Sequence, residues 1–276
     1  MDNTCLQVCN EDQTAFIEVV PARGGIITRW QVQGREILYL DKERFANPER
    51  SIRGGIPILF PICGNLPNDT YVYDDQSIPL RQHGFARDLP WQVIHHTPTS
   101  IEIALESNDL TLPYYPFDFQ VKIAYQLQGP RLTLECEIAN RGLVKMPFSL
   151  GFHPYFAVED KSLVSFDIPA TQMFDHLTRQ HGPFNGEIPV STSEVDAAFF
   201  PVSQTVARLK GEPTIELTYD PIFTTLVVWT LQSKPYICLE PWTAQRNALN
   251  TGIDLQWVEP HQSRHAAVTL TVLATD

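Results

Sequence analysis

The stretch RLTLECEI, at residues Arg131–Ile138, sets a pattern that recurs along the chain. Its leucines, cysteine and isoleucine alternate with arginine, threonine and glutamates, and successive side chains of a β-strand point to opposite faces. The alternation therefore predicts a strand with one buried face. Ile101–Leu105 and Val268–Val272 repeat it, whereas Phe223–Thr230 and Tyr236–Leu239 are continuous apolar runs, as expected for strands buried on both faces.

Glycines and prolines separate these runs, and the chain has 22 prolines against 14 glycines. So many prolines suit short strands joined by turns better than long helices. The best helix candidate is Lys42–Arg50, which Pro48 weakens. Many short strands at close spacing, with no internal repeat and no linker, predict an all-β protein with few short helices. We expect residues 1–276 to form a single large antiparallel β-sandwich domain.

Composition and charge exclude several classes of function. The chain has 276 residues, 43% hydrophobic and 19% charged, which is enough to bury a large core. Its net charge of −12 argues against nucleic-acid and membrane partners, although local arginines can still hold one small anion. There is no bilayer-spanning run and no secretory signal, and the five cysteines contain no CxxC pair. We expect a cytoplasmic monomer or weak homodimer with reduced thiols.

Polar residues interrupt the alternation in four segments, where function is expected in a sandwich. The first, IRGGIPILFPICGN at residues 52–65, places Arg53 before two glycines, and its prolines exclude a regular central strand. Alternatively, Arg53 is a surface arginine before a turn. The second, RQHGFAR at residues 81–87, can present donors to hydroxyls or to a phosphate, or can be a polar turn whose arginines pair with acids such as Asp88.

The other two segments carry a histidine and a glutamate. His153 lies among aromatic residues in FSLGFHPYF, residues 148–156, and Glu240 ends the apolar run of YICLEPWT, residues 236–243. Burial raises a carboxyl pKa, which suits a general base near neutral pH. His153 can instead be a core histidine that donates to a carbonyl, and Glu240 a structural carboxylate. His176 and the remaining histidines lack such a context and are interpreted as surface residues.

Motifs for metals and cofactors are absent. The sequence has no HExxH, GxGxxG or GxxxxGK[ST] arrangement and no nucleophile elbow. We therefore expect neither a metal nor a cofactor.

Four motifs in order resemble the aldose 1-epimerase (galactose mutarotase-like) superfamily, and most closely its hexose-6-phosphate mutarotase branch. They are RGGIPILFPICGN at 53–65, HGFAR at 83–87 followed by Trp91, GFHPYF at 151–156 and CLEPW at 238–242. The resemblance implies a single β-sandwich with a shallow sugar cleft. It also implies a cofactor-free interconversion of the α and β anomers of an aldose.

The resemblance further implies roles for individual residues. His153 matches the family's catalytic histidine and Glu240 its catalytic glutamate. The substrate-binding candidates are Arg53, Gln82, His83, Arg87 and Asp196. Gly151-Phe152 replaces the asparagine-rich segment of galactose mutarotases, and the residues after Pro241 also differ, which argues against free galactose as the dedicated substrate.

These roles give a simple mechanism. We expect Glu240 to take the proton from the anomeric hydroxyl O1 while protonated His153 gives a proton to the ring oxygen O5. The nearby carboxylate is expected to help keep the histidine protonated. Arg53, Arg81 and Arg87 can bind a 6-phosphate if their segments meet. A non-catalytic carbohydrate-binding sandwich remains an alternative. A glycoside hydrolase or polysaccharide lyase is another, with Glu240 and Asp196 as its carboxylates.

Overall fold

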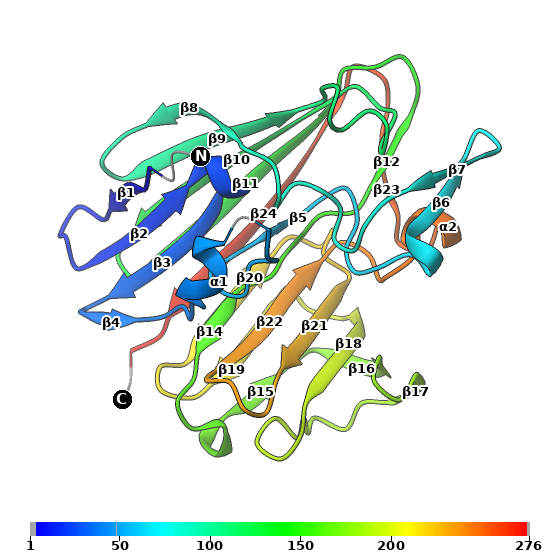
Figure 1. Ribbon diagram of the computed structural model, residues 1–276. Helices are drawn as coiled ribbons and strands as arrows, with labels where there is room; N and C mark the ends of the chain where they lie inside the picture. The colour runs from blue at the N-terminus through cyan, green and yellow to red at the C-terminus, as the bar shows by residue number, and fades with distance from the viewer. Residues whose placement is uncertain (1–3, 48, 275–276) are drawn as a thin grey trace.

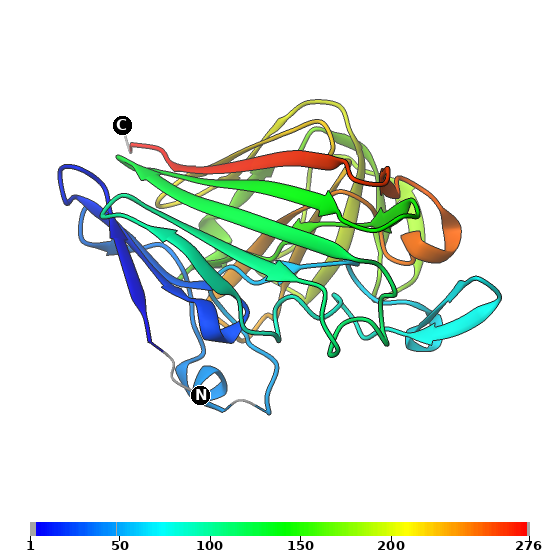
Figure 2. The same ribbon diagram turned by 90° about the horizontal axis from the view of Figure 1, so that it is seen from above.

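Two eight-stranded antiparallel sheets form the framework of the protein in a computed structural model, which describes residues 4–47 and 49–274 (Figure 1). We call them the long sheet and the site sheet. In spatial order the long sheet contains β15 (Ser165–Asp167), β19 (Val206–Lys210), β20 (Ile215–Tyr219), β24 (Ser263–Val272), β11 (Arg131–Asn140), β10 (Phe119–Gln128), β9 (Ser100–Glu106) and β8 (Gln92–His96). Figure 2 shows its longest strands side by side, with β24 next to β11.

The site sheet lies against the long sheet. Its strands, in order, are β17 (Gln180–Pro183), β16 (Ala170–Asp175), β18 (Val195–Val202), β21 (Thr225–Thr230), β22 (Tyr236–Trp242), β13 (Gly151–Phe152) and β5 (Ile58–Leu59), and β14 (Tyr155–Ala157) also pairs with β22. The two prolines of the 52–65 segment limit β5 to two residues, because proline cannot donate to a ladder.

Smaller elements complete the fold. A four-stranded N-terminal sheet contains β1 (Leu6–Cys9), β2 (Ala15–Val20), β3 (Ile26–Val32) and β4 (Arg35–Glu36). Two-stranded ladders join β6 (Thr70–Tyr73) to β7 (Gln76–Pro79), and β12 (Met146–Phe148) to β23 (Gln256–Val258). The helical segments of the described chain are short: α1 (Lys42–Ala46), α2 (Ala248–Thr251), and 3₁₀ turns at Pro21–Arg23, Pro67–Asp69 and Lys161–Leu163.

The predicted all-β class with few short helices is confirmed. β11 alternates buried and more exposed residues along its length, and β21 and β22 are buried on both faces as their continuous apolar runs predict. The length predicted for the helix at Lys42–Arg50 is wrong. The helix ends at Ala46, and the backbone turns to extended geometry at Asn47, before the proline at position 48, which lies outside the described residues.

One large apolar cluster lies between the sheets. It includes Trp30 of the N-terminal sheet, Tyr125 of the long sheet and Leu239 of the site sheet, all fully buried. The Tyr125 hydroxyl donates a hydrogen bond of 2.8 Å to the backbone carbonyl of Gly25, which ties the N-terminal sheet to the long sheet.

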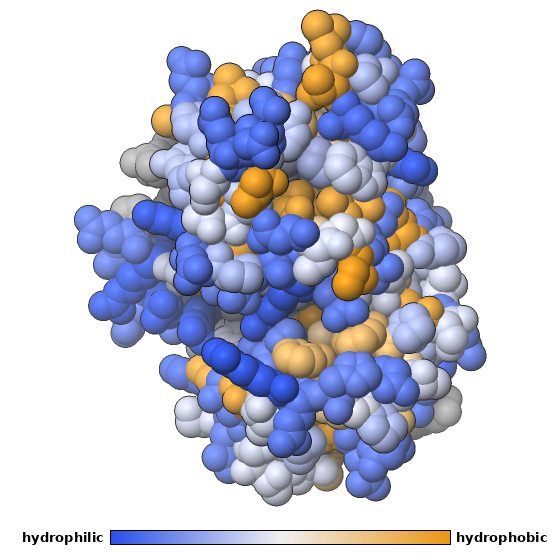
Figure 3. Space-filling model, turned by 90° about the vertical axis from the view of Figure 1, so that its right-hand side faces the viewer, coloured by the Kyte–Doolittle hydropathy of each residue, from blue (hydrophilic) through white to orange (hydrophobic). Residues whose placement is uncertain are grey.

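The surface is largely polar. Figure 3 shows the side that carries β6, β7 and α2, where separate apolar side chains lie among hydrophilic ones. Among the described residues, none of the helices is long and apolar enough to cross a membrane. All five cysteines are unpaired, and Cys136 and Cys238 are buried as predicted.

Candidate active site

The register of the site sheet aligns a row of functional side chains. Asp196 of β18 lies opposite Trp229 of β21, Trp229 lies opposite Cys238 of β22, and Cys238 lies opposite Tyr155 of β14. Residues directly opposite one another in an antiparallel pair share a face of the sheet. Glu240 lies two residues beyond Cys238 on the same strand, so it faces the same way.

Strand β22 carries its carboxylate on the face turned away from the main core. Ile237 and Leu239 pack into the cluster between the sheets, whereas Cys238, Glu240 and Trp242 alternate with them. The outer face is buried as well, because other segments cover it. This double burial explains why the sequence of the strand is almost continuously apolar.

His153 reaches Glu240 from the turn between β13 and β14. Its backbone N–H donates a hydrogen bond of 3.0 Å to the carbonyl of Pro57, which fixes the turn. The His153 Nε2 lies 3.3 Å from Glu240 Oε1, and the Trp242 Nε1–H donates to Glu240 Oε2 at 3.1 Å. Glu240 is only 1% exposed and His153 only 8%, so both side chains are almost completely buried.

Burial sets the protonation of this pair. It raises the pKa of Glu240 well above its ordinary 4.5, and the charge of Asp196 adds to the rise. Burial, with the Arg87 guanidinium as the next cause, lowers the pKa of His153 to about 3. The sequence predicts that the neighbouring carboxylate helps to keep His153 protonated. The structure adds an opposing effect: desolvation of the buried pair favours the neutral form of each group.

His83 is a neutral hydrogen-bond donor at the same site. Burial, and after it the charge of Arg87, lowers its pKa well below 6.5. Its Nδ1 accepts a hydrogen bond of 3.1 Å from the backbone N–H of Gly64, so the proton of the neutral ring resides on Nε2. Trp91 anchors the loop, because its indole N–H donates to the carbonyl of Ala86 at 2.9 Å.

Asp196 is held by an arginine that the sequence analysis did not single out. The Arg246 Nη2 lies 2.7 Å from Asp196 Oδ1 and 2.9 Å from Oδ2. The stem of Arg246 crosses Gly64, where an added Cβ would lie 2.1 Å from the arginine Cγ. One signal was present: Arg246 belongs to the segment after Pro241 that departs from the galactose mutarotase pattern.

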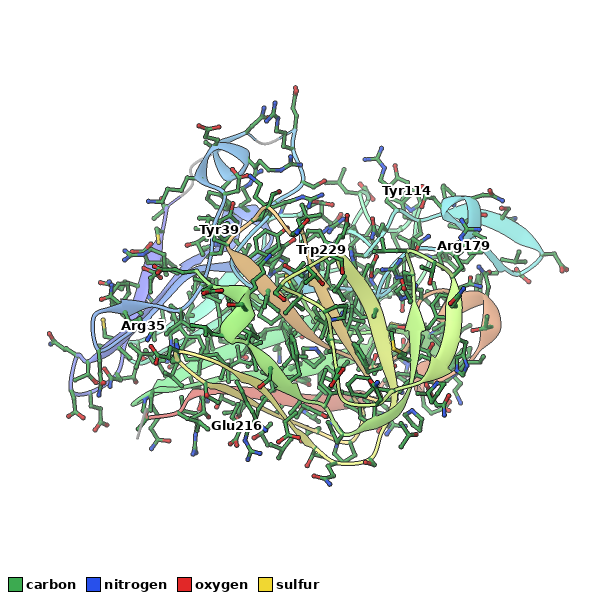
Figure 4. The ribbon with its side chains drawn as sticks, turned by 90° about the horizontal axis from the view of Figure 1, so that it is seen from below. Arg35, Tyr39, Tyr114, Arg179, Glu216 and Trp229 are labelled. Carbon is green, nitrogen blue, oxygen red and sulfur yellow. The ribbon has the colours of Figure 1, made fainter. Side chains whose placement is uncertain are left out.

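Aromatic rings surround the histidine. Tyr155 stacks on His153 with ring centroids 4.7 Å apart and an interplanar angle of 10°, and Trp229 meets both rings edge-on. The guanidinium of Arg53 lies over the Trp229 ring, 4.9 Å from its centroid. Figure 4 labels Trp229 together with Tyr39, which reaches the same aromatic group through its contact with Tyr236.

Two adjoining cavities meet at these residues. The inner cavity, of about 290 Å³, is lined by all seven candidate residues: Arg53, Gln82, His83, Arg87, His153, Asp196 and Glu240. The outer cavity, of about 880 Å³, adds the arginines Arg23, Arg50 and Arg81 and the acids Glu49, Asp69 and Asp88. Residues that line both cavities are Ser51, Ile52, Gln82, Arg87 and Arg246.

The arginines thus divide between the cavities. Arg87 lines both, and its Nη2 donates to the Gln82 carbonyl at 2.9 Å, whereas Arg81 lines only the outer cavity and Arg53 only the inner one. The nearest acid to Arg87, Asp88, has its Oδ2 3.9 Å from Arg87 Nε and is mostly exposed, so the pair is weak.

His176 departs from its prediction as a surface residue. It is half-buried, and its backbone N–H donates to the carbonyl of Asp196 at 2.8 Å. Burial, followed by the charge of Arg246, lowers its pKa to about 4. The backbone of this histidine therefore contacts Asp196, while its side chain lines neither cavity.

The fold and this site define an all-β protein with a buried carboxyl–imidazole pair at a small polar cavity. The model of the aldose 1-epimerase family matches residues 8–270. The chain belongs to the aldose 1-epimerase family and is therefore an isomerase that acts on sugars.

Solved structures and curated relatives agree with this assignment. The crystal structure of the Slr1438 protein from Synechocystis sp. PCC 6803 is 44% identical, with a TM-score of 0.96 over 100% of this chain and 97% of that one. A galactose mutarotase related enzyme from Lactobacillus acidophilus shares the fold at 21% identity, with a TM-score of 0.84 over 99% and 98% of the two chains. A protein of Cenchrus ciliaris described as a candidate glucose-6-phosphate 1-epimerase is 29% identical over 68% of this chain and 59% of its own length.

Proposed function

We propose that this isomerase is a cofactor-free mutarotase in which Glu240 is the base and His153 the acid. The observation that carries the proposal is the 3.3 Å contact between Glu240 Oε1 and His153 Nε2 at the wall of the inner cavity. Ring opening of a hemiacetal needs one group that accepts the O1 proton and one that donates to O5. A carboxyl and an imidazole side by side supply both.

The protons balance through the cycle. In the free protein Glu240 holds the proton of the pair and His153 is neutral, because burial disfavours charge on both. Transfer of that proton to His153 Nε2 gives the carboxylate and the imidazolium, and Arg87 and Arg246 favour the carboxylate. Glu240 then accepts the O1 proton while His153 donates to O5, which restores the neutral pair. The open chain rotates about C1–C2, and closure reverses the steps.

The remaining wall of the cavity is suited to hold a sugar. His83 offers an N–H, and Gln82 and Arg53 offer further donors to hydroxyls. Asp196 is neutralised by Arg246 and can accept from a hydroxyl without leaving an unpaired charge. The same ion pair argues against the hydrolase alternative, which needs two carboxylates that flank the scissile bond.

The base is tested by replacing Glu240 with Gln. E240Q keeps the size of the side chain but removes its acid–base function, so kcat/KM for mutarotation should fall by roughly 10²- to 10⁴-fold. Polarimetry measures the rate, and circular dichroism checks the fold. The matched control is E259Q, at an exposed glutamate that pairs with Lys145. Unchanged rates in E240Q would contradict the role, and sugar binding without mutarotation in the wild type would favour a carbohydrate-binding protein.

The substrate we propose is a hexose 6-phosphate. Arg81 and Arg50 are exposed in the outer cavity and Arg87 lies at the junction, so a sugar in the inner cavity can extend a phosphate toward several guanidiniums. This local cationic group stands against the overall charge of −12. The Cenchrus ciliaris relative, whose description names glucose 6-phosphate, supports the choice.

Competition between glucose 6-phosphate and glucose tests this choice. In a polarimetric assay the wild type should favour the phosphorylated sugar. Arg81→Gln should reduce that preference by roughly 10- to 100-fold, because one charge-assisted hydrogen bond contributes about 1.5–3 kcal/mol. Arg179→Gln, at an exposed arginine outside both cavities, is the control (Figure 4). Equal rates on the two sugars would remove the phosphate from the proposal.

A further inference from the structure

Cys238 lies beside the acid–base pair, and the proposed mechanism leaves it unused. One ligand atom each from His153, Cys238 and Glu240 can be chosen so that all three lie within 4.8 Å of one another, and all three residues are buried. The geometry of the sheet causes this clustering. Cys238 and Glu240 are two residues apart on β22 and share a face, and the turn before β14 brings in the imidazole.

These three groups form a donor set typical of zinc. An imidazole nitrogen, a thiolate and a carboxylate oxygen are its usual ligands, at about 2.0–2.3 Å, which places neighbouring ligand atoms of a tetrahedron roughly 3.3–3.8 Å apart. The His153 Nε2 and Glu240 Oε1 are already 3.3 Å apart. The other ligand atoms lie within 4.8 Å, so closing the set needs side-chain movement of about 1 Å.

We propose that His153, Cys238 and Glu240 form an inhibitory site for a soft divalent cation, of which Zn²⁺ is the best fit. The fourth ligand is water or a sugar hydroxyl, because His153 and Glu240 line the inner cavity. A bound cation occupies the lone pairs that would exchange protons with the substrate. The metal-binding part of this proposal stands alone, and the inhibitory part rests on the proposed mutarotase function.

The nearby arginines do not oppose cation binding, because binding leaves the total charge of the site unchanged. Binding releases the thiol proton of Cys238 and the carboxyl proton of Glu240, so Zn²⁺ with two anionic ligands has no net charge. The metal-free pair of a neutral thiol and a neutral carboxyl has none either. Arg53, Arg87 and the other guanidiniums therefore act on the same total charge in both states.

Cobalt(II) is the direct probe, because a thiolate ligand to Co²⁺ gives a charge-transfer absorption in the near ultraviolet. The full-length wild type titrated with CoCl₂ should develop this band, and ZnCl₂ should bleach it. C238A should lack the band. C238S, which nearly keeps the side-chain volume, repeats the test if C238A does not fold. The matched control is C136A, which removes a buried thiol of the long sheet and should behave as the wild type.

Polarimetry with glucose tests the inhibition. ZnCl₂ should slow wild-type mutarotation by roughly 10-fold or more at saturation, and EDTA should restore it. C238A should weaken zinc inhibition by more than roughly 100-fold, because the loss of an outer partner alone costs about 10–100-fold in metal affinity. Absence of the charge-transfer band in the wild type would overturn the site whether or not the protein is a mutarotase. A band together with undiminished mutarotation, or equal inhibition of C238A, would overturn the inhibitory role.

Discussion

Glu240 couples the chemistry of the site to the stability of the protein. Its raised pKa means that the native state keeps a proton that the unfolded chain loses above 4.5. The stability that this group contributes is therefore fully present below pH 4.5 and is lost as the pH rises through the raised pKa. His153 has the opposite sign: its contribution is present above pH 6.5 and is lost as the pH falls toward about 3.

This linkage predicts a pH-dependent effect of E240Q on folding. The variant has no proton to lose, so its free energy of unfolding relative to the wild type should increase as the pH rises above 4.5 and should level off above the raised pKa of Glu240. Urea denaturation at several pH values measures the difference. E259Q should show no such trend, because water solvates that exposed carboxylate in both states. A constant difference for E240Q would show that the carboxyl is not buried in its neutral form.

At the scale of single elements, two local features position the side chains of the site. They are the alternation of core-facing and site-facing residues along β22 and a glycine with a positive φ. The strand sends Leu239 to the core and Glu240 to the site, so a one-residue slip would exchange them. Gly64, with φ of +71°, packs directly beneath Arg246 and donates to His83. The glycine therefore positions two walls of the inner cavity at once.

Gly64→Ala should disturb this element more than an equivalent change elsewhere. Gly34 has a similar φ of +80° but nothing within 4 Å of an added Cβ, so G34A reports the left-handed strain alone, about 1–2 kcal/mol. G64A adds the clash with Arg246 and should displace that side chain from Asp196. We expect G64A to unfold at lower urea than G34A and to raise KM, whereas G34A should keep the wild-type KM. Equal effects of the two variants would mean that Arg246 is not constrained by Gly64.

At the scale of the whole molecule, three sheets share one core. The N-terminal sheet depends on the long sheet for its burial, and the hydrogen bond from Tyr125 to Gly25 joins them across a fully buried boundary. The stability of the N-terminal sheet should therefore depend on its packing against the long sheet, whereas Glu240 lies on the site sheet.

Tyr125→Phe tests this separation. Losing the buried hydroxyl leaves the Gly25 carbonyl without that donor, which should cost about 1–3 kcal/mol of unfolding free energy. Mutarotation at 25 °C should stay at the wild-type rate. The control is Tyr114→Phe, at a partly exposed tyrosine labelled in Figure 4, which should change neither quantity. A Y125F variant with reduced activity but normal stability would contradict the separation.

The sequence alone determined the all-β class and the segments that carry the site. Alternation such as that of Arg131–Ile138 reflects the two-residue period of a strand, which is a local property and is readable from the chain. The prolines around Ile58–Leu59 and the glutamate ending the apolar run of β22 are equally local signals. The four segments contain six of the seven candidate residues that line the inner cavity, and Asp196, which lies outside them, was assigned by the family resemblance alone.

Only the tertiary structure decided how those residues act on one another. Asp196 and Arg246 are distant in sequence, and only the folded chain makes them an ion pair. The depth of burial that raises the pKa of Glu240 and lowers the pKa of His153 likewise arises from several covering segments at once. The juxtaposition of Cys238 with both is a matter of sheet register. Desolvation and pairing depend on three-dimensional surroundings, so no local pattern encodes them.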